Sequence, residues 1–197
     1  MKYVNQTQYP HIPYITRTDP DCPRHEYGKT TTIRTSGCGL CAAVMVADRL
    51  IPNCTFELED ALALSYETKA NHGIGTDYNI FAPAFAEKLG LVWEQTNDFD
   101  RLRQCVRTGG AAVLLVKANG DKPGLFTRSL HYITVIGEEP DGRFAILDPS
   151  LTDGKYEEYD RKGKTELKNE VLLLCTEENV RKEVTEAPLP LNLFWRK

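Results

Sequence analysis

The stretch TSGCGLCAAVMVA, residues 35–47, places one cysteine between two glycines at the start of an apolar, alanine-rich run. Ser36 and the glycines suit a helix N-terminus, and residues 42–47 are apolar on nearly every side, so a buried helix is predicted from about Cys38 to Leu50. A thiol in the first turn of a helix meets free main-chain N–H groups and the positive end of the helix dipole, which lower its pKa. Cys38 is therefore a candidate nucleophile.

A cysteine beside a hydrophobic helix is also commonly a packing residue, because free cysteine is among the most buried residue types. The flanking residues Gly37 and Gly39 favour the reactive interpretation. Two glycines around a core cysteine are expected to serve no packing purpose, whereas they let a substrate backbone come close.

The chain has 197 residues, a formal net charge of -4 and a pI near 5.6. This length fits one domain, with residues 1–37 as an irregular, proline-rich N-terminal arm. A net negative charge does not indicate the basic surface that binds nucleic acid or an anionic membrane. The first residues lack the apolar segment of a signal peptide and no run reaches membrane-spanning length, so a cytoplasmic protein with reduced thiols is expected; secretion stays possible for a truncated chain.

Apolar spacing predicts three further helices, over about 56–69, from residue 76 or 77 to 89, and from residue 98 or 100 to about 108. The period then changes to that of strands. Residues 111–116 suit a central strand buried on both faces, residues 131–137 and 143–147 suit a hairpin, and further strands are expected near 156–159 and at 171–175. The charged segment 160–170 is expected to be a solvated loop. Helices followed by an antiparallel sheet predict an α+β fold.

A cysteine nucleophile needs a general base, and four histidines are available. His11 and His72 lie in arm and turn segments where solvation is expected. His25, close to Cys22, has no second pair of ligands with zinc-like spacing, and neither a metal nor a cofactor is expected. His131 begins a strand whose sheet would hold it in place.

The hairpin geometry supplies an orienting group for His131. If Gly137 and Gly142 close the turn, antiparallel pairing places Asp148 directly opposite His131, with Cβ atoms about 5 Å apart on one face. An error of one residue in the register would put the two on opposite faces. The alternative is a core histidine and an aspartate that only opens the turn at Pro149.

Three motifs together resemble those of the C39-like cysteine peptidases: Ser-Gly-Cys-Gly at residues 36–39 opening an alanine-rich helix, LHYITVIG at 130–137, and ILDP at 146–149. They occur in the family's order over about two thirds of the chain. The resemblance implies a papain-like fold with N-terminal helices packed on a C-terminal antiparallel sheet. It also implies Cys38 as nucleophile, His131 as general base and acid, and Asp148 as the orienting residue.

The resemblance further implies an oxyanion hole formed by the main-chain N–H of Cys38 and an upstream glutamine. The stretch NQTQYP, residues 5–10, is similar to the family's early Asn-Gln-x-x-Tyr segment and favours Gln6. Gln8 and Arg17 are the alternatives. Leu40 and Cys41 depart from the family, in which proline and a small hydroxyl residue commonly follow; Cys41 is then a packing residue or a resolving thiol.

The favoured function is a cysteine peptidase or amide hydrolase that acts on a peptide, isopeptide or protein substrate through a thioester. A second hypothesis is thiol–disulfide exchange through Cys38 and Cys41, whose spacing is that of a thioredoxin-type motif. Residues 31–37 do not form the apolar strand that such a fold requires. A third hypothesis is a catalytically silent peptide-binding module on the same fold.

Overall fold

The computed structural model describes residues 1–18, 24, 26–118 and 124–197. Its largest part is a seven-stranded antiparallel sheet with the strand order β5-β11-β6-β7-β8-β10-β9. The strands are β5 (Leu91–Thr96), β6 (Ala111–Lys117), β7 (Leu130–Glu138), β8 (Phe144–Leu147), β9 (Thr165–Leu167), β10 (Leu172–Cys175) and β11 (Leu191–Arg196). Mixed helix and sheet with a large antiparallel sheet agrees with the α+β expectation.

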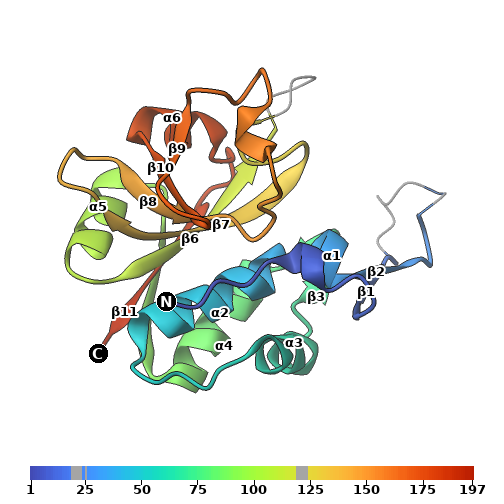
Figure 1. The fold of residues 1–197 in the computed structure, drawn as a ribbon. Helices are drawn as coiled ribbons and strands as arrows, with labels where there is room; N and C mark the ends of the chain where they lie inside the picture. The colour runs from blue at the N-terminus through green and yellow to red at the C-terminus, as the bar shows by residue number, and fades with distance from the viewer. Residues whose placement is uncertain (19–23, 25, 119–123) are drawn as a thin grey trace.

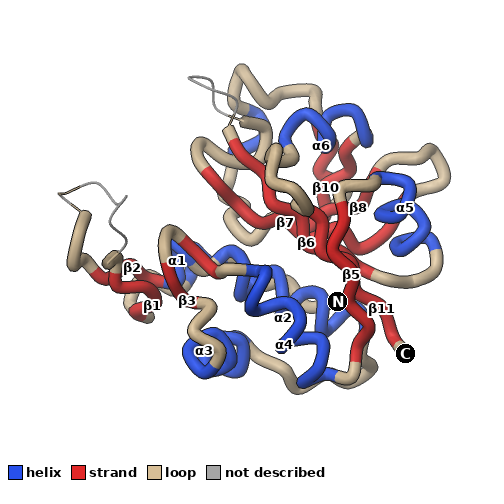
Figure 2. Tube along the Cα trace, turned by 180° about the vertical axis from the view of Figure 1, so that it is seen from behind, coloured by secondary structure: helices blue, strands red, loops and turns tan. Residues whose placement is uncertain are grey.

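Helices cover both faces of this sheet (Figures 1 and 2). One face packs on α2 (Cys38–Leu50) and α4 (Tyr78–Leu89), with α3 (Leu58–Glu67) packed against these two helices, and forms the first apolar core. The other face packs on α5 (Phe99–Arg107) and α6 (Glu177–Glu183) and forms the second core. Residues along β6 alternate between the two cores, which confirms the strand predicted to be buried on both faces.

The predicted helix ends are confirmed where their chemistry was specific. The helix expected over 38–50 has those bounds, and nearly all of its residues are buried. Asp77 caps α4 by accepting from the main-chain N–H of Asn79, and Gly90 ends that helix in the left-handed conformation at φ 66°. Asp98 caps α5 by accepting from the N–H of Asp100.

The first 37 residues contain only short elements within the described part: η1 (Gln6–Gln8), β1 (Pro13–Thr16), β2 (Thr30–Thr32) and α1 (Ile33–Ser36). A second small hairpin, β3 (Asn71–His72) with β4 (Gly75–Thr76), lies between α3 and α4. Cys22 and His25, and most of the loop expected at 119–124, lie outside the described residues.

Several expectations for the C-terminal half were wrong. The strand expected near 156–159 is a 3₁₀ turn, η2 (Lys155–Glu157), and Tyr159 beyond it is fully exposed. The expected loop at 160–170 contains β9. The local sequence pattern also missed β5, α6 and β11. The two strands depend on non-local pairing, because β11 comes from the end of the chain and inserts between β5 and β6.

The register predicted for the β7–β8 hairpin was also wrong. Thr134 pairs with Leu147 and Val135 with Ile146, two residues from the predicted alignment. The turn closes later than expected, where Glu139 N–H donates to the Arg143 carbonyl, which alone shifts the register by three. An irregularity between Val135 and Gly137 then removes one residue. The net shift is even, so the predicted faces are preserved.

Candidate active site

Cys38 is the first residue of α2, and its side chain is 9% exposed. The thiol lies within hydrogen-bonding reach of the His131 side chain, which reaches it from β7. The main-chain N–H groups of Gly39 and Tyr132 also face the sulfur. A helix start and a sheet strand therefore meet at this atom.

The two glycines around Cys38 have packing roles, contrary to expectation. A Cβ at Gly37 would lie 2.6 Å from the Ile33 side chain and 2.7 Å from its carbonyl oxygen. A Cβ at Gly39 would lie 2.9 Å from both Thr76 and Tyr78. These separations are far below van der Waals contact, so each glycine lets a neighbouring element approach the start of α2. The close approach is to the protein's own chain.

His131 is the second residue of β7 and is 5% exposed. Its Nε2 donates to Oδ1 of Asp148 at 2.8 Å, and Asp148, directly after β8, is fully buried. Continuing the observed register places residue 150 opposite His131, so the bond to Asp148 runs diagonally across the two strands. Because Nε2 is taken by the carboxylate, Nδ1 is left for Cys38.

The three groups shift each other's ionisation. Burial raises the pKa of the Cys38 thiol, but the hydrogen bond and charge of His131 outweigh burial, and the net pKa is below its usual value. Burial lowers the pKa of His131, whereas Asp148 and Cys38 raise it to about 9. Burial raises the pKa of Asp148, and His131 and Lys155 hold it well below the usual range. These directions favour a thiolate–imidazolium pair beside an ionised carboxylate.

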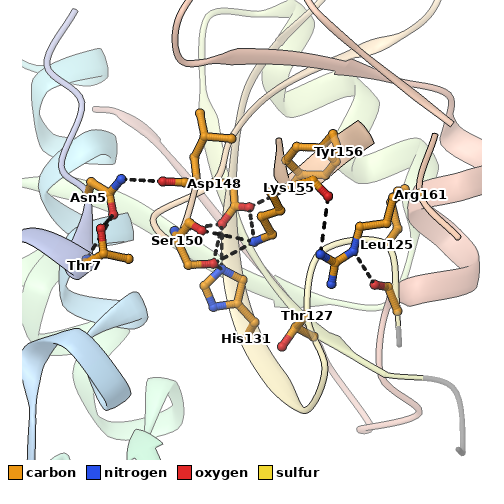
Figure 3. A network of polar contacts seen from close by, with 12 residues as sticks. Asn5, Thr7, Leu125, Thr127, His131, Asp148, Ser150, Lys155, Tyr156 and Arg161 are labelled. Carbon is orange, nitrogen blue, oxygen red and sulfur yellow. Dashed lines mark hydrogen bonds and ion pairs between the residues drawn. The ribbon is translucent and has the colours of Figure 1, made fainter. Parts of the chain in front are cut away.

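Sequence reasoning missed the groups on the second oxygen of Asp148. The Lys155 ammonium and the Tyr156 hydroxyl each donate to Oδ2 at 2.6 Å (Figure 3). On Oδ1, the main-chain N–H of Ser150 donates at 2.9 Å and its hydroxyl at 3.1 Å. Lys155 and Tyr156 come from η2, which overlaps the start of the strand expected near 156–159, so their approach to Asp148 had no local signal.

A cavity of about 540 Å³ opens beside the thiol. Cys38 and His131 lie on its wall together with residues of the β3–β4 hairpin, and Leu115 and Leu130 add apolar surface. The hairpin presents Ile74, 59% exposed, and His72, whose Nε2 lies 3.0 Å from Oδ2 of Asp77. The mostly buried Cys38 thiol is thus open to a ligand from the side of this cavity.

The candidate oxyanion residues have different environments. Gln6 is buried, its N–H donates to the carbonyl of Pro149, and its side-chain amide donates to the carbonyl of Arg34 at 2.7 Å. Among the described residues, Gln6 is absent from the cavity wall and its Oε1 has no hydrogen-bond partner. Gln8 is exposed, and Arg17 lines the cavity and pairs with Glu26. The structure thus joins Cys38, His131 and Asp148, whereas Gln6 bonds to the main-chain carbonyls of Pro149 and Arg34.

Cys41 is fully buried one turn along α2, and burial followed by the charge of Cys38 raises its pKa above the usual range. Cys54, Cys105 and Cys175 are also free thiols, and burial raises the pKa of Cys105 to about 11 and of Cys175 to about 12. In contrast to Cys41, Cys105 and Cys175, Cys38 has surroundings that lower its thiol pKa.

Within residues 1–18, 24, 26–118 and 124–197, no cluster of three or more His, Cys, Asp or Glu side chains could hold a metal ion. Over the same ranges, no helix has both the length and the apolar character needed to cross a bilayer.

Comparison with known proteins finds no protein-family model that matches the sequence and no matching curated protein. Among solved structures, the chain is similar to one described as a "putative C39-like peptidase" from Bacillus anthracis, with a TM-score of 0.52 and 13% sequence identity. The match covers 100% of this chain and 99% of that one. At this identity, the likeness shows a shared fold over the whole length of both chains.

Proposed function

We propose that this chain is a cysteine peptidase or amide hydrolase with a papain-like fold, acting on peptide or protein substrates. The observation that carries the proposal is the contact sequence Cys38–His131–Asp148, with the thiol on the wall of an open cavity. The fold likeness to a chain described as a "putative C39-like peptidase" supports it.

In the proposed reaction, the Cys38 thiolate attacks the amide carbonyl carbon and forms a tetrahedral intermediate. The His131 imidazolium then gives its proton to the leaving nitrogen, the C–N bond breaks, and a thioester remains on Cys38. Neutral His131 next takes a proton from water, whose oxygen attacks the thioester; the acid leaves and the thiolate–imidazolium pair returns. Asp148 keeps the ring oriented and its charge compensated throughout.

The main-chain N–H of Cys38, at the first position of α2, is the proposed fixed donor to the oxyanion. For the second donor we favour Gln6, whose amide keeps one N–H beyond the one given to Arg34. Arg17, on the cavity wall, is the alternative, and exposed Gln8 has the least support. Gln6→Ala and Arg17→Ala should separate the two candidates, because replacing the true donor lowers kcat about 100-fold with little change in KM.

Two observations favour hydrolysis over thiol–disulfide exchange through Cys38 and Cys41. The Cys41 thiol is fully buried and its pKa is raised, so it is a poor resolving nucleophile. The base that faces Cys38 is itself oriented by a carboxylate, an arrangement that acyl transfer uses and disulfide exchange does not need.

The test combines iodoacetamide labelling with digestion of a peptide library. We expect selective labelling of Cys38 that His131→Ala abolishes, and peptide cleavage that Cys38→Ala abolishes in a folded protein. Cys54→Ala, which changes a thiol that does not line this cavity, is the matched control and should keep full activity. Cleavage retained in Cys38→Ala contradicts the proposal, equal reactivity of Cys38 and Cys41 favours exchange, and unenhanced reactivity of Cys38 favours a binding module.

A further inference from the structure

Lys155 is an unusually buried lysine, because its side chain is only 8% exposed and lysine is rarely buried without a partner. Its ammonium donates to Oδ2 of Asp148 at 2.6 Å and to the Ser150 hydroxyl at 2.8 Å. The Tyr156 hydroxyl donates to the same Oδ2 at 2.6 Å. The carboxylate that faces His131 therefore carries a cation on its other oxygen (Figure 3).

The backbone that presents Lys155 is held at both ends. Gly154 precedes it in the left-handed conformation at φ 72°, which favours glycine. Arg161, 3% exposed, donates to the Lys155 carbonyl at 3.4 Å, to Glu158 at 3.0 Å and to the Gly124 carbonyl at 3.2 Å. This 3₁₀ turn is thus fixed by a buried cation of its own.

Contacts on both oxygens prevent the Asp148 carboxylate from rotating. Oδ1 accepts from His131 and from Ser150, and Oδ2 accepts from Lys155 and Tyr156. A fixed Oδ1 fixes the imidazole plane, and hence the direction in which Nδ1 faces the thiol. The ammonium also neutralises part of the charge that would otherwise hold the imidazolium proton.

We propose that Lys155 is a positioning residue that locks Asp148 through its second oxygen and makes the His131 imidazolium a stronger acid toward the leaving amine. This inference rests on the proposed function and extends it to a four-residue chain, Lys155–Asp148–His131–Cys38. Tyr156 contributes a hydrogen bond to the same oxygen without adding charge.

The charged and titratable groups that surround the Asp148–His131 pair come from four segments. His131 approaches from β7, Lys155 and Tyr156 from η2, and Cys38 from α2 on the far side of the imidazole. Tyr3 from the N-terminal segment donates to the main-chain carbonyl of Asp148 at 2.6 Å. Among the described residues, Lys155 is the lysine or arginine whose side chain pairs with this carboxylate.

The experiment compares pH profiles of kcat and kcat/KM for Lys155→Met and Tyr156→Phe, with Lys168→Met as the control at an exposed pair with Glu139. Lys155→Met should lower kcat about 10- to 100-fold, with KM within about twofold. Its basic limb should move upward by about one pH unit or more, because the imidazolium loses a nearby like charge. Tyr156→Phe keeps the cation and should keep the wild-type basic limb. Lys168→Met should match wild type throughout.

A basic limb in Lys155→Met that coincides with wild type overturns the proposal, even if kcat falls, since a purely structural role leaves that limb in place. If methionine prevents folding, Lys155→Gln, which keeps a donor without the charge, should show the same upward shift, and an unshifted limb overturns the proposal equally. Failure of the proposed function is distinct: wild type itself then shows neither cleavage nor selective labelling of Cys38.

Discussion

Replacing Asp148 by asparagine should destabilise the fold mainly through Lys155. The substitution keeps the shape and leaves one amide oxygen to accept from His131 and Ser150. The amide NH₂ then occupies the place of Oδ2, where it faces the Lys155 ammonium and the Tyr156 hydroxyl, both of which are donors to that position. A nearly buried cation is left without its counter-charge.

Breaking one partner of a buried ion pair costs about 3–5 kcal/mol of unfolding free energy. For a chain of this size, each kcal/mol lowers the unfolding midpoint by about 2–4 °C, so Asp148→Asn should lower it by about 6–20 °C. Asp148→Asn/Lys155→Met removes the unpaired charge and should be more stable than Asp148→Asn alone.

The assays are thermal unfolding, which gives the midpoint temperature, and urea unfolding, which gives the free energy, both monitored by circular dichroism for wild type, both single variants and the double variant. Asp141→Asn, an exposed turn residue paired with Arg143, is the control and should leave the midpoint unchanged. Destabilisations that add to within about 0.5 kcal/mol in the double variant would refute the reasoning, because independent sites add and coupled ones do not.

Three further predictions follow from the site. In His131→Gln, the pKa of the Cys38 thiol should rise above its usual value, because burial remains and the lowering contribution of the imidazolium is gone. The pH dependence of iodoacetamide alkylation measures this pKa, and an unchanged profile contradicts the pairing of Cys38 with His131. Folding lowers the pKa of Asp148, so its contribution to stability is present in full above about pH 4 and is lost as pH falls further. The urea midpoint should therefore drop more steeply between pH 5 and pH 2 in wild type than in Asp148→Asn. Parallel curves for the two proteins would show that Asp148 is not the group responsible. Gly39→Ala should cost about 1–3 kcal/mol in urea unfolding and lower activity, because its Cβ would lie 2.9 Å from Thr76, whereas an undisturbed variant would mean that α2 and β4 yield freely.

The position of Cys38 at the start of a buried helix was predictable because its signals are local. Cys38, the apolar run behind it, and the caps at Asp77, Gly90 and Asp98 each act within a few residues of the chain. The same local view misjudged Gly37 and Gly39, since the groups that require them belong to Ile33, Thr76 and Tyr78.

The pairing of His131 with Asp148 was predicted from a register that is wrong by two residues. The contact forms because a late turn and one irregularity near Ile136 sum to an even shift, which returns both residues to one face. No feature of the sequence predicts that these two shifts sum to an even number, so the contact between His131 and Asp148 was predicted from an incorrect alignment.

The amino-acid sequence alone determined that Cys38 lies at a helix start, the change from helical to strand periodicity and the α+β class, because these depend on spacing within one segment. Only the tertiary structure decided that β11 joins β5 to β6, that Lys155 and Tyr156 reach Asp148, and that Gln6 bonds to Arg34. Those contacts join residues through burial and non-local pairing, whose free energy depends on the whole fold and leaves no periodic trace in the chain.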